Sequence, residues 1–360
     1  MKKILTVIGT RPEIIRLSAL LSILDQKFQN IIIFTGQHYD NIMGYKFFEE
    51  LNLPKPHHDL KIGKTLSHKQ VSIMTEKIGD ILIKEKPNLV LVYGDTNSVL
   101  AGALAASKTG IKIAHLEAGC RSFNKTTSEE INRIIVDHIS HFLFPPDRVA
   151  LKNLENEGLK SNVFYLGSTG TDSCLRNLEL SKRSKILDKL KLKHKEYVLV
   201  TIHRAENTND KNILSNIIDG LNKISNTIEV IFPIHPRTSN IINKNNIPLS
   251  KKIKILEPLP YLDFLNLMNN SFLVLTDSGG IQEEAAICNV PCLVLRNETE
   301  WTRLVNLGKN FLIGVEPDKI ERSFLDLFNN KNKYNKILKI KNQIEKDVHY
   351  KILETLEKNI

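Results

Sequence analysis

Cysteine is scarce in this chain, which has only four in 360 residues: Cys120, Cys174, Cys288 and Cys292. No two of them form a Cys-x-x-Cys pair, and none has a histidine nearby at metal-ligand spacing. This pattern excludes a disulfide-rich scaffold and predicts no metal site. We expect reduced, mostly buried thiols.

Long hydrophobic runs are also missing. The longest apolar runs, such as Leu89–Val92, have the length of a strand, whereas a membrane span needs about 18–20 apolar residues. The apolar segment before Thr10 is too short for a signal peptide. The sequence therefore predicts a cytoplasmic protein with no membrane partner.

The charge is unbalanced, with 50 Lys and Arg against 40 Asp and Glu, a formal net charge of +10. Such an excess can indicate nucleic-acid binding. However, the chain has no basic block with interleaved aromatics, and Lys and Asn are common throughout, as in residues 329–336. We expect an anionic small molecule as the partner and no nucleic acid.

What the sequence does contain is a regular alternation of short β-branched runs with helical segments. This alternation, in a chain too long for one core, predicts an α/β protein with two doubly wound, Rossmann-like domains facing a cleft. The predicted strands are residues 3–8, 30–35, 89–93, 111–116, 142–145, 163–166, 197–202, 229–233, 253–256, 272–276 and 292–295.

The predicted domain boundary lies near residue 168, where the strand pattern pauses in a Gly- and Lys-rich stretch. The first domain is expected to span residues 1–168 and the second residues 169–343. A last helix, predicted from about Tyr334 to Lys358, has no strand after it. We expect its end, about residues 344–360, to join the first domain.

Polar clusters follow the predicted strands of the first half, where open α/β sheets bind ligands. Gly9-Thr-Arg-Pro-Glu13 follows the first strand, Asp95 follows another, and Glu117 ends the next. Arg11 would offer a forked donor to a phosphate, yet the run lacks the Gly-x-Gly-x-x-Gly dinucleotide fingerprint. Capping and ordinary turn formation would equally explain a lone Asp or Arg at these places.

Glu129 and Arg133 stand four residues apart on one predicted helix, so they can form a pair on one face. A plain acidic first turn with a salt bridge would explain the same spacing. Several carboxylates in one desolvated site, however, take different pKa values, which is how acid and base roles arise. Asp95, Glu117 and Glu129 are therefore candidates for proton transfer.

The second half places His203, His235 and Arg237 at predicted strand ends, which indicates an anion site. The run Ser278-Gly-Gly280 stands where a strand meets a helix, so helix amides could cradle a diphosphate. Glu284, one turn further on, could hold a ribose diol. A Ser-Gly-Gly run also caps ordinary helices, so the spacing alone leaves both interpretations open.

These runs resemble the non-hydrolysing UDP-N-acetylglucosamine 2-epimerases, from Ile4 to about Gly314. Relatives that hydrolyse the glycosyl bond carry a His-Gly-Gly-like stretch in place of Glu117-Ala-Gly119. The matching runs are Gly9-Thr-Arg-Pro-Glu13, Thr35-Gly-Gln-His38, Tyr93-Gly-Asp-Thr-Asn97, Glu117-Ala-Gly-Cys-Arg-Ser122, Glu129-Glu-Ile-Asn-Arg133, His203-Arg-Ala-Glu-Asn207, His235-Pro-Arg237 and Asp277-Ser-Gly-Gly-Ile-Gln-Glu-Glu284.

The resemblance implies a fold like that of the GT-B glycosyltransferases, a homodimer, and a UDP-sugar substrate epimerised without NAD or metal for surface polysaccharide synthesis. UDP would leave as C2 loses its proton, and return after reprotonation on the other face. The implied catalytic residues are Asp95, Glu117, Glu129 and His203; the implied substrate- or UDP-binding residues are Arg11, Arg16, Arg133, His235, Arg237, Ser278, Gly279, Gly280 and Glu284.

The chain departs from the family pattern in ways that bear on the sugar. Arg16 stands where many family members have Lys, and Ser128 stands where Pro is common. Trp301-Thr-Arg303 stands where members commonly have a Pro-Glu run. The last resembles the branch acting on UDP-2,3-diacetamido-2,3-dideoxyglucuronate; the run after Arg11 resembles members that make N-acetylfucosamine precursors. Asp40 stands where members activated by a second UDP-sugar carry Gln.

Three alternatives to epimerisation of UDP-N-acetylglucosamine stay open from the sequence. One is the same reaction on another UDP-2-acetamido sugar. A glycosyltransferase of similar architecture would transfer the sugar without inverting C2. A UDP-sugar-binding regulator would bind without turnover, although binding alone does not require three carboxylates.

Overall fold

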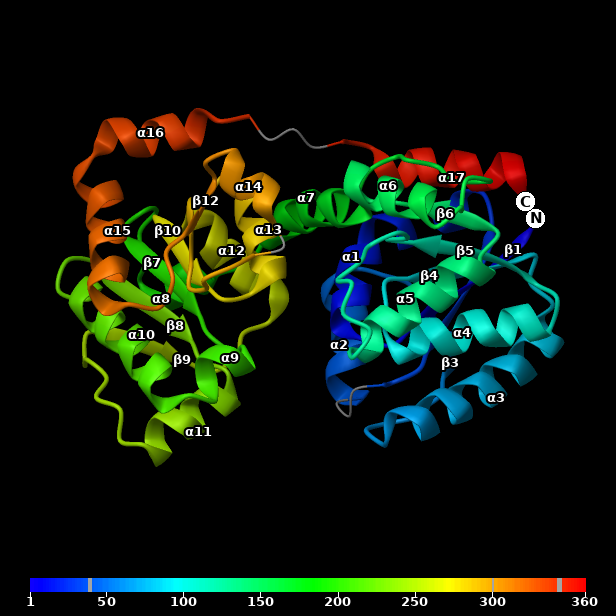
Figure 1. Cartoon of the computed structure of the whole chain (residues 1–360), viewed down its shortest axis with the longest axis horizontal. Coiled ribbons are helices and arrows are strands. Elements are labelled where there is room, and N and C mark those ends of the chain that lie inside the picture. The colour runs from blue at the N-terminus through cyan, green and yellow to red at the C-terminus, as the bar shows by residue number, and fades with distance from the viewer. Residues whose placement is uncertain (38–40, 300, 342–344) are drawn as a thin grey trace. The chain divides into compact units, whose positions relative to one another are not determined.

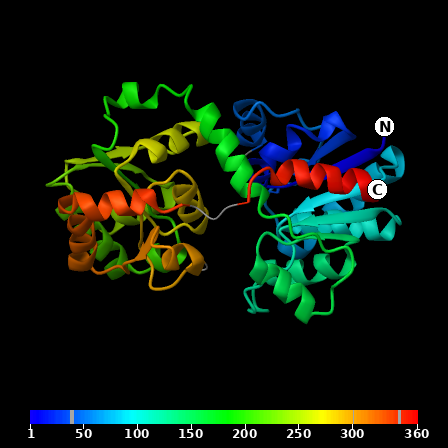
Figure 2. The same cartoon turned by 90° about the horizontal axis from the view of Figure 1, so that it is seen from above.

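The computed structural model describes residues 1–37, 41–299, 301–341 and 345–360. The chain forms two compact units, Met1–Arg176 with Ile344–Ile360, and Asn177–Gln343. Each unit is built on a six-stranded sheet with helices packed around it (Figures 1 and 2). The division between the units falls inside helix α7 (Thr169–Ser181), a few residues beyond the position that the sequence suggests.

In the first unit all strand pairs are parallel and the strand order is β3-β2-β1-β4-β5-β6. The strands are β1 (Lys3–Ile8), β2 (Gln29–Phe34), β3 (His58–Asp59), β4 (Leu89–Tyr93), β5 (Lys112–Leu116) and β6 (Phe142–Phe144). The helices are α1 (Arg11–Leu21), α2 (Asn41–Glu50), α3 (Ser67–Glu85), α4 (Asn97–Lys108), α5 (Ser128–Ile139), α6 (Arg148–Asn156), α17 (Val348–Asn359) and the 3₁₀ turn η1 (Leu24–Gln26).

The second unit repeats this topology, with the parallel order β12-β11-β10-β7-β8-β9. Its strands are β7 (Tyr197–Thr201), β8 (Glu229–Pro233), β9 (Ile253–Leu256), β10 (Leu273–Thr276), β11 (Cys292–Val294) and β12 (Asn310–Leu312). Its helices are α8 (Ile186–Leu190), α9 (Ala205–Thr208), α10 (Lys211–Ile224), α11 (Pro236–Lys244), α12 (Tyr261–Asn270), α13 (Gly279–Ile287), α14 (Thr302–Asn306), α15 (Pro317–Asn329) and α16 (Lys331–Lys339).

Both sheets confirm the predicted fold class. The central strand β4 is apolar on every residue and fully buried, and β1, β7 and β10 are mostly apolar and buried, because helices cover both faces. In each unit the strand order reverses at one point, between β1 and β4 and between β7 and β10. Such a switch point is where open α/β sheets bind ligands.

Two sequence predictions of secondary structure are wrong, and two short strands were missed. The chain near residue 163 makes only an isolated bridge from Val163 to Leu143 rather than a strand. Strands β3 and β12 were not expected from the sequence. The predicted single helix 334–358 is two helices, α16 and α17: Ile340 is extended after α16, and the backbone N–H groups of Asp347 and His349 bond to the Asp172 carboxylate where α17 begins.

Helix α17 packs on α1, and the two chain ends meet within the first unit. The Lys2 ammonium donates to the carbonyl oxygen of Ile360 at 2.8 Å, as the neighbouring N and C labels in Figure 2 illustrate. His349 also donates from its ring to Asp172, an acid that is 5% exposed. The last helix is thereby held by side-chain contacts as well as by its apolar face.

Two glycines give opposite expectations for the same substitution. A Cβ on Gly9 would lie 1.9 Å from Ser98 Oγ and 2.6 Å from Ser98 Cβ, on the neighbouring helix α4. We expect Gly9→Ala to lower the free energy of unfolding by about 1–3 kcal/mol, since the core must shift. Gly79, inside α3, has open space around it.

Gly79→Ala is thus the matched control, and we expect it to raise the free energy of unfolding by about 0.5–1 kcal/mol. Urea denaturation followed by circular dichroism measures both changes. A Gly9→Ala variant as stable as Gly79→Ala would show that Ser98 does not constrain this turn.

Candidate functional site

The first group of predicted site residues lies at the carboxyl ends of β1, β4 and β5, on the segments that follow these strands. Arg11 and Arg16 lie on α1, which begins two residues after β1. Asp95 follows β4, and Glu117 follows β5. These strands are neighbours in the sheet and span its switch point, so their loops share one edge.

Asp95 pairs with Arg133, although the sequence suggested Glu129 as the partner of that arginine. The Arg133 guanidinium donates to Asp95 Oδ2 and, at 3.0 Å, to Glu130 Oε2. Glu130 is 1% exposed and also accepts from the backbone N–H groups of Ser122 and Phe123. Burial works against ionisation of Glu130, yet these hydrogen bonds lower its pKa.

Glu129 lies in the first turn of α5 and is exposed. No hydrogen bond or ion pair of its side chain is found in the part of the chain that the structure describes. The pairing of Glu129 with Arg133 is therefore wrong for this structure. Burial explains the outcome, because the side chain of Glu130 is the one that faces inward at this turn.

Glu117 has a left-handed backbone, with φ of +69°. This conformation costs a residue with a side chain about 1–2 kcal/mol, and such strain gathers at functional sites. Arg16 Nη1 lies 3.4 Å from Glu117 Oε1. A Cβ on Gly94 would lie 3.2 Å from Glu117 Oε2, so the Glu117 carboxylate sits against the turn that leads into Asp95.

Glu13 is a carboxyl whose role the sequence did not reveal. It is 3% exposed and accepts from Thr10 N at 3.1 Å, from Gly9 N, and from Thr96 Oγ1 at 2.6 Å. Burial raises its pKa to about 7, with a smaller contribution from the charge of Asp95. Glu13 therefore joins the loop after β1 to the loop after β4. The Arg11 guanidinium lies 4.6 Å from the centroid of the Phe47 ring.

The second group lies in the other unit, on the loops after β7, β8 and β10. His203 is 44% exposed on its side chain, and its Nδ1 lies 3.1 Å from Asp277 Oδ1. Asp277 is fully buried and accepts from the backbone N–H groups of His203 and Arg204. Burial opposes the charge of Asp277, but its hydrogen bonds to His203 and Arg204 lower its pKa. Asp277 is therefore a carboxylate, and it orients the His203 ring.

His235 and Arg237 lie beside this histidine, after β8. The rings of His203 and His235 have centroids 6.3 Å apart. The His235 ring accepts from the backbone N–H of Arg237, and Arg237 donates to Asn209 Oδ1 at 2.5 Å. The two histidines and the arginine are exposed, as residues that meet a ligand would be.

Helix α13 begins at Gly279, so Ser278 is its N-cap and Gly279 and Gly280 form its first turn. First-turn N–H groups have no partner within a helix and favour anions. Glu284 lies one turn on, and its Oε1 accepts from the Tyr261 hydroxyl at 2.8 Å. The switch point between β7 and β10 thus carries His203 and this helix start together.

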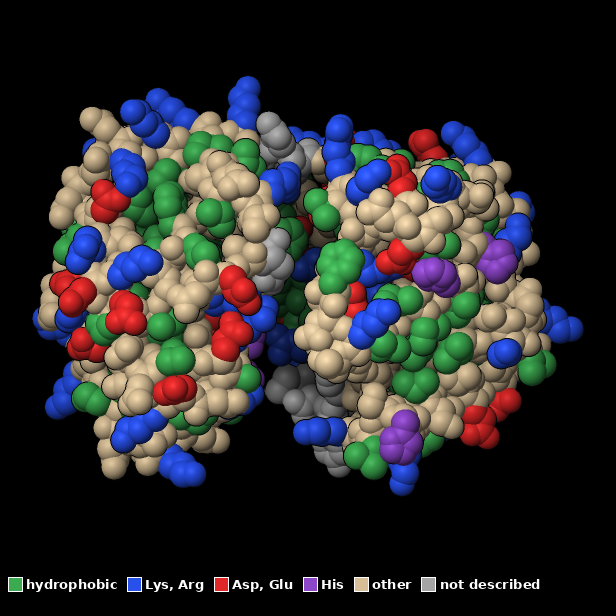
Figure 3. All heavy atoms as spheres, in the orientation of Figure 1, with side chains coloured by type: hydrophobic (Ala, Val, Ile, Leu, Met, Phe, Trp, Pro, Cys, Tyr) green, Lys and Arg blue, Asp and Glu red, His purple; other side chains and the backbone are tan. Residues whose placement is uncertain are grey.

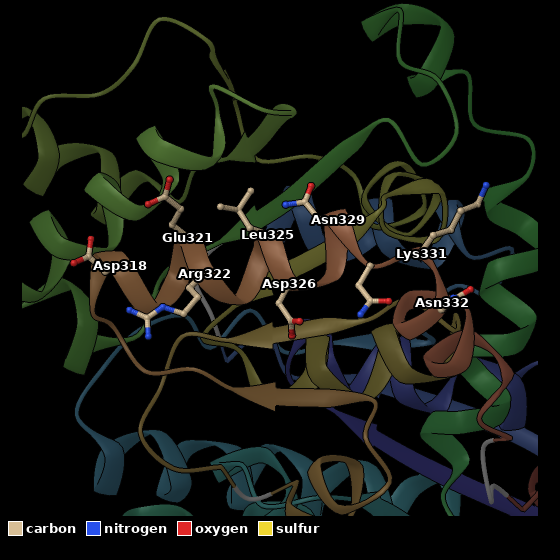
Figure 4. A pocket seen from close by; sticks show the side chains of 9 residues that line it. Asp318, Glu321, Arg322, Leu325, Asp326, Asn329, Lys331 and Asn332 are labelled. Atoms are coloured by element: carbon tan, nitrogen blue, oxygen red, sulfur yellow. The ribbon is translucent and has the colours of Figure 1, made fainter.

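A surface hollow lies on the second unit. It has a volume of about 910 Å³ and runs along α15 and the start of α16, where Glu321, Arg322 and Asp326 line it (Figure 4). Its lining contains none of the predicted site residues. On the face drawn in Figure 3, Lys and Arg side chains are spread among acidic ones rather than gathered in one patch.

Two further findings concern metal sites and membrane-spanning helices. No group of three or more His, Cys, Asp or Glu in the described residues is arranged to hold a metal ion. No helix in the described ranges has the length and apolar character required to cross a membrane. His38, which ends the run Thr35-Gly-Gln-His38, lies outside the described residues, and so does Asp40.

Comparison with known proteins identifies the family. The family model described as UDP-N-acetylglucosamine 2-epimerase matches residues 23–357. A UDP-N-acetylglucosamine 2-epimerase homolog of Methanococcus maripaludis is 48% identical over 324 residues, 88% of this chain and 90% of that protein. A UDP-2,3-diacetamido-2,3-dideoxy-D-glucuronate 2-epimerase of Pseudomonas aeruginosa is 43% identical, over 89% of this chain and 91% of that protein.

A solved structure agrees with this assignment over the whole chain. The crystal structure of Methanocaldococcus jannaschii UDP-GlcNAc 2-epimerase in complex with UDP-GlcNAc and UDP is 42% identical, covers 98% of this chain and 99% of its own, and has a TM-score of 0.84. The sequence motifs, the two matching sheets and these similarities lead to one conclusion: the chain belongs to the UDP-N-acetylglucosamine 2-epimerase family.

Proposed function

We propose that this protein is a non-hydrolysing epimerase that interconverts UDP-N-acetylglucosamine and UDP-N-acetylmannosamine. The observation that carries the proposal is the placing of Asp95 and Glu117 on adjacent loops at a switch point, in a family named for this reaction. A related enzyme of 42% identity was crystallised with UDP-GlcNAc and UDP.

The chemistry requires acid and base groups together with stabilisation of a leaving group. C2 of the sugar is not next to a carbonyl, so its proton is barely acidic. A carboxylate takes that proton as the C1–oxygen bond breaks, and UDP leaves with the electron pair. Return of a proton to the opposite face of C2, with UDP adding back at C1, gives the epimer.

We assign proton transfer to Asp95, Glu117 and Glu129, with Arg133 orienting the sugar. The support is the pairing of Arg133 with Asp95 and the position of Arg16 beside Glu117. A guanidinium that is already held by acids presents its remaining donors in a fixed direction.

We assign the UDP diphosphate to the first-turn amides at Ser278, Gly279 and Gly280, and the ribose to Glu284. His203, held by Asp277, would stabilise departing UDP together with His235 and Arg237. Arg11 is assigned to nucleotide binding from the family resemblance. Donors already directed at the developing charge supply the largest part of such stabilisation.

Deuterium exchange tests the proposal directly. Purified protein is incubated with UDP-GlcNAc in D₂O and followed by proton NMR. We expect UDP-ManNAc to appear with deuterium at C2, because the proton lost in the elimination exchanges with solvent. A spectrum that stays unchanged would contradict UDP-GlcNAc as the substrate. Transfer of the sugar to an acceptor without inversion would indicate a glycosyltransferase.

A second candidate substrate is UDP-2,3-diacetamido-2,3-dideoxyglucuronate. It is favoured by the 43% identity to the Pseudomonas aeruginosa enzyme named for that sugar and by exposed Arg303 on α14, which could meet a sugar carboxylate. The same D₂O assay with this sugar distinguishes the two. We further propose, from the family resemblance, a cytoplasmic homodimer that serves surface polysaccharide synthesis; light scattering of the purified protein tests the dimer.

A further inference from the structure

A fully buried, hydrogen-bonded pair of side chains lies directly behind the two proposed catalytic loops of the first unit. It consists of His115 on β5 and Asp137 on α5, both 0% exposed, with His115 Nδ1 lying 2.7 Å from Asp137 Oδ1. Neither residue is reached by solvent, so neither can touch a substrate. Neither residue was a candidate from the sequence, although His115 stands two positions before Glu117.

Asp137 holds the loop that carries Glu117. Its Oδ2 accepts from the backbone N–H of Gly119 at 3.0 Å and from Arg121 Nη1 at 2.7 Å. Arg121 is in turn bound by both oxygens of Glu157, beyond α6. Burial opposes the charge on Asp137, but the charges and hydrogen bonds of His115 and Arg121 lower its pKa.

His115 holds the loop that carries Asp95. Its Nε2 lies 2.8 Å from the carbonyl oxygen of Gly94, which can only accept a hydrogen bond. Because Asp137 is kept as a carboxylate, the other ring nitrogen also faces an acceptor. Each ring nitrogen therefore lies against one loop system, Nε2 against the Gly94 carbonyl and Nδ1 against Asp137, and the polar atoms of the pair have partners.

Gly94 is the point where the two loops meet. Its N–H donates to the Leu116 carbonyl at 3.0 Å, immediately before Glu117. The space beside its α-carbon is taken by the Glu117 carboxylate, 3.2 Å from where a Cβ would be. On the other side it leads into Asp95. A shift of Gly94 would therefore change the distance between the two acids.

We propose that His115 and Asp137 are positioning residues for the epimerisation, which fix the placement of Asp95 relative to Glu117 by tying the Gly94 carbonyl to the Gly119 amide. This inference rests on the proposed function for its kinetic consequences, since it concerns the acids assigned there. A satisfied buried network of this kind gives a unique geometry. Misplacing a reacting group by about 1 Å can cost about 100-fold in rate.

Two substitutions of His115 separate the two bonds. Gln can place its amide near the position of Nε2, so His115→Gln keeps the donor to Gly94 and loses the bond to Asp137. Asn can place its amide near Nδ1, so His115→Asn keeps the bond to Asp137 and loses the donor to Gly94. Both remove a buried ring, so each serves as the control for the other.

We expect His115→Asn to lower kcat about 10–100-fold with KM within about threefold of wild type. The substitution misplaces the acids that transfer the proton but leaves the substrate-binding residues unchanged. His115→Gln should keep kcat within about fivefold, since Asp137 retains Gly119 and Arg121. Thermal unfolding should shift equally in the two variants. Equal losses of kcat in both, following the loss of stability, would overturn the proposal in favour of a purely structural pair.

Amide hydrogen exchange supplies a test that does not depend on turnover. In the full-length protein, exchange at Gly94 should be faster in His115→Asn than in wild type or His115→Gln, because the bond that holds this turn is missing. If wild type turns over no UDP-sugar, the proposed function fails while this exchange still decides the positioning. Unchanged exchange at Gly94 in His115→Asn would overturn the positioning role by itself.

Discussion

Replacing Asp95 by Asn should lower turnover of the UDP-sugar by about two to four orders of magnitude while the fold stays intact. Positioned acid–base groups contribute about 10²–10⁴-fold to rate, and an amide cannot take or return the C2 proton. Asn keeps the shape of Asp and one acceptor for Arg133, its partner in the structure. The loss should therefore appear in kcat more than in KM.

Glu117→Gln and Glu129→Gln should behave in the same way if all three acids act in proton transfer. Steady-state kinetics and deuterium incorporation at C2 measure the effect, and circular dichroism checks the fold. Glu354→Gln, on an exposed face of α17, is the control and should match wild type. Near-wild-type activity in all three acid variants would contradict the mechanism, and activity retained by Glu129→Gln alone would remove Glu129 from it.

The sequence was most informative about strands that are both long and central. β1, β4 and β8 were predicted with their observed bounds, because a buried parallel strand is apolar on nearly every residue. Strand β3 escaped prediction because it is two residues long and polar, His58 and Asp59. It pairs with β2 only through tertiary context, which no local pattern encodes.

The site shows the same limit at the level of single residues. The sequence pattern was enough to place Asp95, Glu117 and His203 after strands, since parallel strands present their carboxyl ends at one edge. Partner choice was not accessible in this way. Glu129 and Glu130 are adjacent, and only packing decides that Glu130 turns inward to meet Arg133.

Buried acids were missed for a related reason. Glu13, Asp137 and Asp277 are buried, but in the sequence each looks like an ordinary helix residue or part of a motif. Their burial depends on neighbours far along the chain, which a local pattern does not show. Asp277 stands next to Ser278, at the start of the run Asp277-Ser-Gly-Gly-Ile-Gln-Glu-Glu284. A signal existed there, since an acid between a strand and a Gly-Gly helix start faces backbone amides.

Glu13 leads to a prediction about stability and pH. Its pKa rises from an ordinary 4.5 to about 7, chiefly through burial. Between these values the folded protein binds a proton that the unfolded chain has released, so this group makes stability fall as pH rises from about 4.5 to 7. Above pH 7 the cost is complete and on the order of 3 kcal/mol.

Glu13→Gln should remove this dependence. The amide oxygen can accept from Gly9 and Thr10, and the amide nitrogen can donate to Thr96 Oγ1, so the contacts of the protonated acid are reproduced. Relative to wild type, the variant should be equally stable near pH 4.5 and more stable by a few kcal/mol at pH 8. Urea denaturation followed by circular dichroism at several pH values measures the difference.

Thr96→Val is the matched control for this measurement. It removes the hydroxyl that donates to Glu13 but keeps the acid. The stability should still fall as pH rises from 4.5, and the fall should continue above pH 7, because one bond that favours the carboxylate is lost and the pKa of Glu13 rises further. A Glu13→Gln variant whose stability follows pH as wild type does would show that Glu13 is ionised throughout. The turn after β1 would then hold a buried carboxylate stabilised by the amides of Gly9 and Thr10.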